Sequence, residues 1–321
     1  MKLRLLTALL GSATLLFAGP APAAYPEKPI TMIVAYAPGG GTDLMARVIA
    51  PLIEKHLGNN EKIAVVNRPG AGGEIGFTAL ADAAPDGYTI GMLNTPNVIS
   101  IPIERQTRFS WDKYDLLGNL VDDPGGFAVH NDSPIKSLKE LGEYAKANPN
   151  AVTVGSTGVG SDDHLAMLVF GKLTGTKMTH VPYGGSSQVL TGLLGRHITV
   201  ASTNIGELSQ FISSGAPFRV LGQMSQKRWE GAPDTPTFKE QGYDMEFASL
   251  RGMGAPKGLP ADIREKLVGA VAKAVAEPEF ATKAKEIFSP VRFLPPAEYA
   301  AAMKKADDEL RALWKEMPWG K

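Results

Sequence analysis

A glycine-rich loop near the start of the chain has the composition of an anion site. The segment Ala37-Pro-Gly-Gly-Gly-Thr-Asp43 follows an apolar run and leads into a helical pattern. The first N–H groups of a helix lack intrahelical partners and carry the positive end of the helix dipole, and glycines let a ligand approach them. Such a loop binds an anion without lysine or arginine, although a tight turn that binds nothing has the same pattern. No Gly-Lys-Ser/Thr follows the loop, which argues against a nucleotide P-loop.

The acidic residue at the end of this loop, Asp43, has two open interpretations. A carboxylate in the first turn of a helix is stabilised by the dipole and caps backbone N–H groups. Asp43 also suits a residue that fixes the loop or accepts a ligand hydroxyl, amide or bridging water. Because like charges repel, we do not expect Asp43 to touch an anionic ligand group directly.

A second loop of the same form is Val154-Gly-Ser-Thr-Gly-Val-Gly-Ser-Asp-Asp-His164. Beside the amides that open the next predicted helix it carries three hydroxyls, those of Ser156, Thr157 and Ser161. Asp162, Asp163 and His164 raise the question of a metal site, but adjacent residues on a helix point in different directions. No second ligand pair at helical spacing supports such a site, so we predict no metal and expect the acidic residues to match the helix dipole.

A third strand exit, Val181-Pro-Tyr-Gly-Gly-Ser-Ser187, adds Tyr183 as an aromatic donor and two serines as possible caps. Three small-residue loops leaving strands fit the rule that open α/β sheets bind ligands at the carboxyl ends of their strands. Arg251, further along the chain, suits either a salt-bridging residue at a hinge or a clamp on the ligand, and we favour the structural role.

Signatures of catalysis are missing from the sequence. It contains no Gly-x-Ser-x-Gly elbow, no His-Glu-x-x-His and no cysteine. We therefore predict no catalytic residue and no cofactor.

The loops require strands that alternate with helices. Apolar, β-branched runs predict strands at 30–36, 63–66, 88–93, 128–130, 152–155, 178–181 and 197–201. Helical spacing predicts helices at 43–57, 75–84, 137–147, 161–173, 187–194, 264–276, 279–288 and 296–314. This alternation predicts βαβ units and mostly parallel sheets with helices outside, an α/β fold.

The composition is that of a globular protein with two lobes. The 321 residues include 33 Lys and Arg against 33 Asp and Glu, so the chain lacks the basic field of a nucleic-acid binder. No Ser/Gly linker separates two blocks, which favours lobes joined by two chain crossings, near 121–126 and 221–232. We accordingly assign 25–122 and 230–321 to a discontinuous lobe 1, and 123–229 to lobe 2.

The first 24 residues have the layout of a secretory signal peptide. Lys2 and Arg4 precede an apolar run from Leu5 to Ala18, and small residues follow at Ala21–Ala24. The apolar run is shorter than the ~20 residues that span a bilayer. We therefore predict export to the periplasm, with 1–24 removed.

At this point the sequence resembles the Bug family, the periplasmic receptors of tripartite tricarboxylate transporters. The matching segments, in order, are Tyr25-Pro-Glu-Lys-Pro-Ile30, Pro38–Asp43, Asn67-Arg-Pro-Gly-Ala-Gly-Gly73, Pro85-Asp-Gly-Tyr-Thr89, Gly155–Leu165, His180-Val-Pro-Tyr-Gly184, Pro233-Asp-Thr-Pro-Thr-Phe238 and Ala255-Pro-Lys-Gly-Leu-Pro260. Each motif alone is weak, but the ordered set is specific and covers nearly the whole chain after the signal.

The resemblance implies a type II periplasmic-binding-protein fold, with two α/β lobes and a ligand cleft between them. It also implies that amides and hydroxyls of the two helix-opening loops hold a ligand carboxylate, often with ordered water. Carried onto this sequence, the ligand-binding residues are Pro38, Gly39, Gly40, Thr42, Asp43, Asn94, Thr95, Ser156, Thr157, Gly160, Ser161, His164, Tyr183 and Asn204. Two features depart from the family pattern: Pro51 inside the first helix, and the Asp162–Asp163 pair, which is expected to alter ligand charge preference.

We therefore expect a monomeric receptor that closes around a small organic carboxylate and delivers it to membrane transporter subunits. Dicarboxylates, citrate-like tricarboxylates, amino acids and aromatic carboxylates all remain candidates. Two other functions stay open: a secreted α/β hydrolase or transferase that uses the loops as an oxyanion site, and a receptor that serves a sensor kinase.

Overall fold

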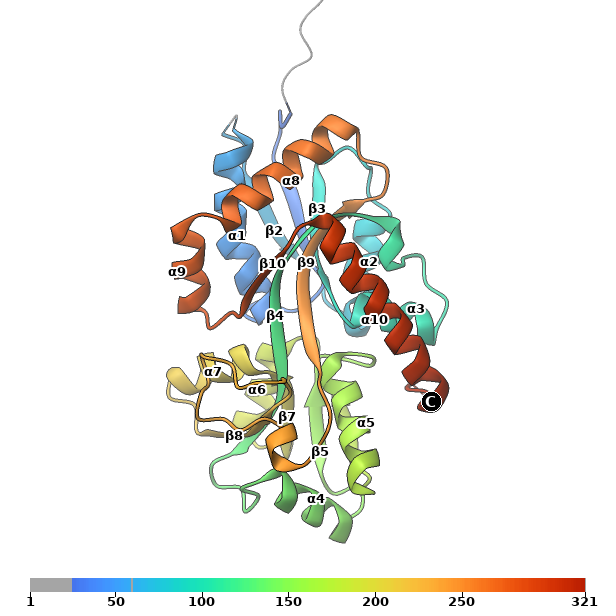
Figure 1. Ribbon diagram of the computed structural model, residues 1–321, viewed down its shortest axis with the longest axis vertical. Helices are drawn as coiled ribbons and strands as arrows, with labels where there is room; N and C mark the ends of the chain where they lie inside the picture. The colour runs from blue at the N-terminus through green and yellow to red at the C-terminus, as the bar shows by residue number, and fades with distance from the viewer. Residues whose placement is uncertain (1–24, 59, 321) are drawn as a thin grey trace, which may run out of the picture.

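The computed structural model describes residues 25–58 and 60–320, so the predicted signal peptide lies outside the described residues. Figure 1 shows an upper and a lower lobe, with the long strand β4 (Tyr114–His130) running through both. Within the described residues no helix has the length and apolar character needed to cross a membrane.

The sheet of the upper lobe combines parallel and antiparallel pairs. Its strands in spatial order are β2 (Ile63–Asn67), β1 (Ile30–Val34), β3 (Thr89–Asn94), β9 (Ala248–Pro256) and the first part of β4, which also pairs with β10 (Val291–Leu294). Strand β1 runs parallel to β2 and β3, whereas β9 runs antiparallel to β3 and β4. The parallel strands send their carboxyl ends, and the loops that follow, toward the lower lobe (Figure 1).

The lower lobe is built on the second part of β4. This part pairs antiparallel with β7 (Val200–Asn204) and β8 (Phe218–Gln223), while β5 (Thr153–Ser156) runs parallel to β7 and to β6 (Thr179–Pro182). Along β4 the partner changes from β9 at Pro124 to β7 at Gly125. Instead of the short strand predicted at 128–130, one strand of 17 residues connects the two lobes.

Helices cover the sheets. They are α1 (Gly41–Leu57), α2 (Glu74–Ala81), α3 (Asn97–Glu104), α4 (Leu138–Ala147), α5 (Asp162–Thr174), α6 (Ser186–Leu194), α7 (Ile205–Ser213), α8 (Ala261–Val275), α9 (Pro278–Glu286) and α10 (Pro296–Glu316). In the upper lobe α1, α8 and α9 lie on one side of the sheet, and α2, α3 and α10 on the other (Figure 1). Helix α1 includes Pro51, which is exposed.

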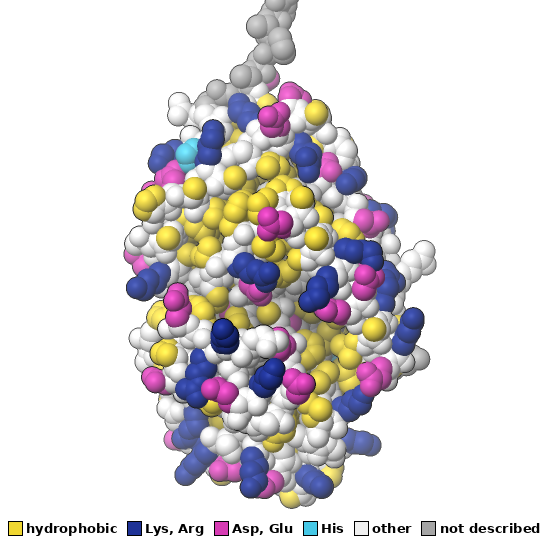
Figure 2. Space-filling view, in the orientation of Figure 1, with side chains coloured by type: hydrophobic (Ala, Val, Ile, Leu, Met, Phe, Trp, Pro, Cys, Tyr) yellow, Lys and Arg dark blue, Asp and Glu magenta, His cyan; other side chains and the backbone are white. Residues whose placement is uncertain are grey.

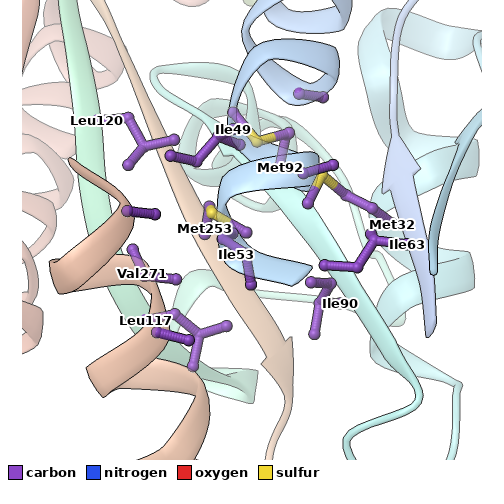
Figure 3. Close-up of a cluster of buried hydrophobic side chains, with 14 of the residues drawn as sticks. Met32, Ile49, Ile53, Ile63, Ile90, Met92, Leu117, Leu120, Met253 and Val271 are labelled. Carbon is purple, nitrogen blue, oxygen red and sulfur yellow. The ribbon is translucent and has the colours of Figure 1, made fainter. Parts of the chain in front are cut away.

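Each lobe has its own packed interior. In the upper lobe Ile53 of α1 packs among Met32, Met253 and Val271, all fully buried (Figure 3). In the lower lobe Phe127 makes edge-to-face contacts with Phe170 and Phe238, at ring-centroid distances of 5.5 and 5.2 Å. Phe238 belongs to the segment that the sequence division assigns to lobe 1, and the lobe boundaries stay a prediction. A third buried cluster joins the lobes, because Leu165 of α5 belongs to it together with upper-lobe residues such as Ile101 and Trp319.

Charges are mixed over the surface. Figure 2 shows Lys and Arg side chains interspersed with Asp and Glu on the visible face, in keeping with the equal totals of the two signs. Selection of a ligand by charge must therefore come from local groups rather than from an overall field.

Candidate functional site

A small polar cavity lies between the two lobes. Five helices begin around it: α1 and α3 from the upper lobe, and α5, α6 and α7 from the lower lobe. The lining residues are Tyr36, Gly40, Gly41, Thr42, Asn94, Asn97, Thr157, Asp162, Ser186, Asn204, Glu207, Ser249 and Arg251. The cavity measures about 20 Å³, which is room for about one water molecule.

The lobes touch directly around this cavity. The contacts involve the loop before α1 and helix α3 on the upper side, and the loops before α5 and α6 and the first turn of α7 on the lower side. The hydrogen bonds that cross between the lobes include Ala37 N to Gly184 O at 3.0 Å, Ser187 Oγ to Pro38 O at 3.0 Å, Ser100 Oγ to Gly160 O at 2.6 Å and Gly41 N to Glu207 Oε1 at 2.9 Å.

The charged centre of the site is Arg251, on strand β9. Its side chain is 2% exposed, and its Nη2 lies 3.0 Å from Asn204 Oδ1, Glu207 Oε1 and Asp123 Oδ2. Burial lowers the pKa of Arg251, but the carboxylates of Glu207 and Asp123 outweigh this effect and hold it above its ordinary value. Burying a charge costs free energy unless the charge is paired, so the buried guanidinium needs these carboxylate partners. These ion pairs agree with the structural role favoured from sequence, and because Arg251 also lines the cavity its role toward a ligand stays a prediction.

Glu207, at the start of α7, was missed by the sequence analysis. Its Oε1 accepts the Gly41 N–H at 2.9 Å and a hydrogen bond from Arg251, and its Oε2 accepts from the Thr203 hydroxyl. A side chain of the lower lobe therefore holds an amide at the start of α1. The spacing Asn204-x-x-Glu207 has the acidic residue three positions after a capping residue, a signal that could have revealed it.

Side chains of the loops hold several of the amides that the sequence offered to a ligand. Asp43 Oδ2 accepts the Gly39 N–H at 2.9 Å, and Asp163 Oδ2 accepts the Thr157 N–H at 3.1 Å. Burial raises the pKa of Asp43, but hydrogen bonds from Arg47, Gly39 and Asn67 together hold it below the usual value. Asp43 therefore stays ionised and fixes the first loop.

Asp162 and Asp163, at the start of α5, are both buried. Asp162 Oδ2 accepts a hydrogen bond of 2.8 Å from Asn204 Nδ2, and Asp162 lines the cavity, whereas Asp163 turns back to Thr157. Burial raises the pKa of Asp162 to about 6, against the hydrogen bond from Asn204 and the charge of Arg251. Burial and the neighbouring Asp162 raise the pKa of Asp163 well above its ordinary range.

The predicted site residues fall into two groups. Those that line the cavity are Gly40, Thr42, Asn94, Thr157 and Asn204. Those that do not are Pro38 and Gly39, which are exposed; Asp43, Thr95, Ser156, Gly160, Ser161 and His164, which are buried in or behind the loops; and Tyr183, which packs beside Gly155 and Gly192. Besides Glu207, the cavity residues missed from sequence are Tyr36, Asn97 and Ser249, whereas Gly41 and Ser186 lie in loops that the sequence analysis singled out.

A stacked histidine pair supports the second loop from behind. The rings of His164 and His180 lie 4.0 Å apart, His164 Nδ1 accepts the Gly160 N–H, and His180 Nε2 lies 2.6 Å from Ser156 Oγ. Burial lowers the pKa of His164 to about 3, helped by the neighbouring ring, and lowers that of His180 to about 4. Both rings are therefore neutral at neutral pH.

The receptor family of the tripartite tricarboxylate transporters, TctC, matches residues 45–292. This match covers well over half of the chain, so the chain belongs to that family, and the resemblance found from sequence is confirmed. Members are solute-binding receptors and not enzymes, which removes the hydrolase and transferase alternative.

Solved structures of periplasmic binding proteins have the same fold. BugD is 31% identical with a TM-score of 0.85, over 91% of this chain and 98% of BugD. MatC from Rhodopseudomonas palustris with bound malate is 25% identical with a TM-score of 0.84, over 90% and 99%. A second R. palustris protein, with adipate, is 26% identical with a TM-score of 0.83, over 91% and 97%. The predicted α/β periplasmic-binding-protein fold is thereby confirmed.

The histidine pair predicts a specific pH dependence of stability. Histidine in the unfolded chain titrates near pH 6.5, so acid protonates the unfolded state first. The contribution of the pair is fully present above about pH 6.5 and is lost as the pH falls toward 4, at about 1.4 kcal/mol per pH unit for each histidine. The free energy of unfolding, measured by urea denaturation from pH 4.5 to 7.5, should show this slope relative to a His164→Asn/His180→Asn double variant.

The variant design isolates the pair from other titrating groups. Buried carboxylates contribute equally to the wild type and the variant, so the difference between the two proteins reports the histidines. An exposed His197→Asn variant should retain the wild-type slope. A pH-independent difference between wild type and double variant would contradict the burial of neutral rings.

Proposed function

We propose that this receptor binds a small organic carboxylate in the cavity between its lobes. The observation that carries the proposal is the convergence of five helix N-termini, those of α1, α3, α5, α6 and α7, on one cavity. Each N-terminus carries a partial positive charge, and such ends favour anions. The malate and adipate held by two relatives support the same ligand class for this chain.

The carboxylate is received between the first turn of α1 and the first turn of α6. Gly40 and Ser186 face each other there: a Cβ added at Gly40 would lie 2.8 Å from Ser186 Oγ. Tyr36 adds a phenol whose pKa burial and the charges of Asp162 and Asp163 raise above its ordinary value, so it remains a donor. Thr42, Asn94, Thr157 and Asn204, all on the cavity wall, contact the rest of the ligand.

Binding requires the lobes to separate and close again. A cavity of about 20 Å³ is far smaller than the ~300 Å³ or more of typical ligand sites. Strands β4 and β9 are the connections about which the lobes turn. A ligand that contacts both lobes binds the closed state better and therefore shifts the population toward it.

The proposed location and partner follow from the family. We infer that residues 1–24 direct the chain to the periplasm, and that the closed receptor delivers its ligand to the membrane subunits of a tripartite tricarboxylate transporter.

A panel of organic acids tests the ligand class. Malate, adipate, citrate, benzoate and amino acids should be screened by thermal shift, and the acids that bind measured by calorimetry. At 100 times its Kd a ligand should stabilise the receptor by about 2.7 kcal/mol. Small-angle scattering should then show a smaller radius of gyration on binding. Failure of every acid to bind would contradict the proposed ligand class, and binding without compaction would contradict closure.

A substitution at Gly40 tests the location of the site. Gly40→Val should abolish binding because the added side chain meets Ser186 from the opposite lobe and prevents closure. The backbone of Gly40, with φ −83° and ψ 165°, is extended and suits valine, so the variant should fold. Gly269→Val is the matched control, since a Cβ there meets no atom within 4 Å. If Gly40→Val binds the ligand with unchanged affinity, the binding site lies elsewhere in the protein.

A further inference from the structure

Acidic side chains outnumber basic ones in and behind the wall of the cavity between the lobes. Among its lining residues Asp162 and Glu207 are acidic, and Arg251 is basic. Asp123 and Asp163 stand directly behind this wall, the first paired with Arg251 and the second beside Asp162. Four buried carboxyl groups therefore surround one guanidinium. This balance is unusual for a site that takes up an acid.

Carboxylates of the chain itself already offset the positive ends of the helix dipoles at this cavity. Glu207 accepts the Gly41 N–H at the start of α1 and stands in the first turn of α7, while Asp162 and Asp163 stand in the first turn of α5. Since a carboxylate at a helix N-terminus offsets the dipole, little positive potential is left for a ligand with two negative charges. A ligand that adds no net charge avoids this repulsion.

A buried hydrogen-bond acceptor without a partner in residues 25–58 and 60–320, Asn94 Oδ1, also favours a ligand that donates hydrogen bonds. Asn94 is 4% exposed and lines the cavity, and its Nδ2 donates to Thr42 Oγ1 at 2.8 Å. Its Oδ1 is buried and has no hydrogen-bond partner among the described residues. A buried acceptor left without a donor costs about 1–3 kcal/mol, which a donor on the ligand would remove.

We propose that the ligand carries a protonated amine in addition to its carboxylate, and that Asp162 selects this amine, with Asn94 Oδ1 as a second acceptor. This inference rests on the proposed function, because it concerns the same cavity and the same class of acid. The carboxylate lies at α1 and α6, and the amine lies toward α5. The ligand is then zwitterionic at that end, so it adds no net charge beside the buried carboxyl groups.

An amine fits the site better than a hydroxyl group or a metal ion. A hydroxyl supplies a donor for Asn94 but places no positive charge beside the buried Asp162 carboxyl group. No group of three or more His, Asp or Glu in the described part of the chain is arranged to hold a metal ion. Burial raises the pKa of Asp162 and so disfavours its charged form. A cation on the ligand would stabilise that charged form, which also favours an amine over a hydroxyl group.

Matched ligand series test the proposal. Each series keeps one carbon skeleton and changes the group at carbon 2 from hydrogen to hydroxyl to amine: propionate, lactate and alanine; succinate, malate and aspartate; adipate, 2-hydroxyadipate and 2-aminoadipate. Calorimetry at pH 7.5 should show that, in the skeleton that fits the cavity, the amine compound binds about 10-fold to 100-fold more tightly than the other two.

The variant Asp162→Asn removes the charge but keeps an oxygen to accept from Asn204. The preference for the amine over hydrogen at carbon 2, taken as the ratio of the two affinities measured in the variant itself, should fall at least about 10-fold. Asp262→Asn makes the same chemical change in the exposed first turn of α8 and should leave the preference intact. Circular dichroism and melting temperature establish that both variants are folded.

The outcomes separate this inference from the proposed function. If acids without an amine bind at least as tightly as their amine counterparts, the amine proposal is wrong and the carboxylate receptor stands. If Asp162→Asn weakens all acids of a series equally, Asp162 does not select the amine. If no acid of the three series or of the earlier panel binds, the proposed function itself fails.

Discussion

A guanidinium buried between two lobes is the constraint on which the rest of the site depends. Arg251 comes from strand β9, one of the two strands that connect the lobes, and its partners Asp123 and Glu207 come from β4 and α7. A charge this deeply buried requires its carboxylates at hydrogen-bonding distance. Because Glu207 also holds the Gly41 amide, the same network joins α7 of the lower lobe to α1 of the upper lobe. The position of one arginine thus fixes how the walls of the cavity meet.

This network explains how a neutral chain can have a strongly polarised site. Positive and negative residues are equal in number over the whole sequence, yet four carboxyl groups and five helix N-termini gather at one cavity. The helix ends attract the carboxylate of a ligand, and the carboxyl groups limit how much negative charge it brings. Closure brings these two influences together, so recognition of the ligand and movement of the lobes are one process.

The sequence predicts the local units well, because each unit is set by neighbouring residues. The loop 37–43 and helix α1 follow from glycines and helical spacing, and the resemblance gives the family. Strand β9, with Gly252 and Gly254, lacks the alternation of a strand and was missed, whereas β4 is interrupted by Pro124 and three glycines and was predicted only at 128–130. Glu207 acts on an amide 166 residues away, a pairing that only the fold brings about.

A crystal structure with the tightest-binding acid tests the account most directly. The account predicts a carboxylate between the first turns of α1 and α6, contacts to both lobes, and an amine toward Asp162. An acid held by one lobe alone, held chiefly by the Arg251 guanidinium, or bound in the separate groove that Trp229, Phe288 and Val291 line would contradict it.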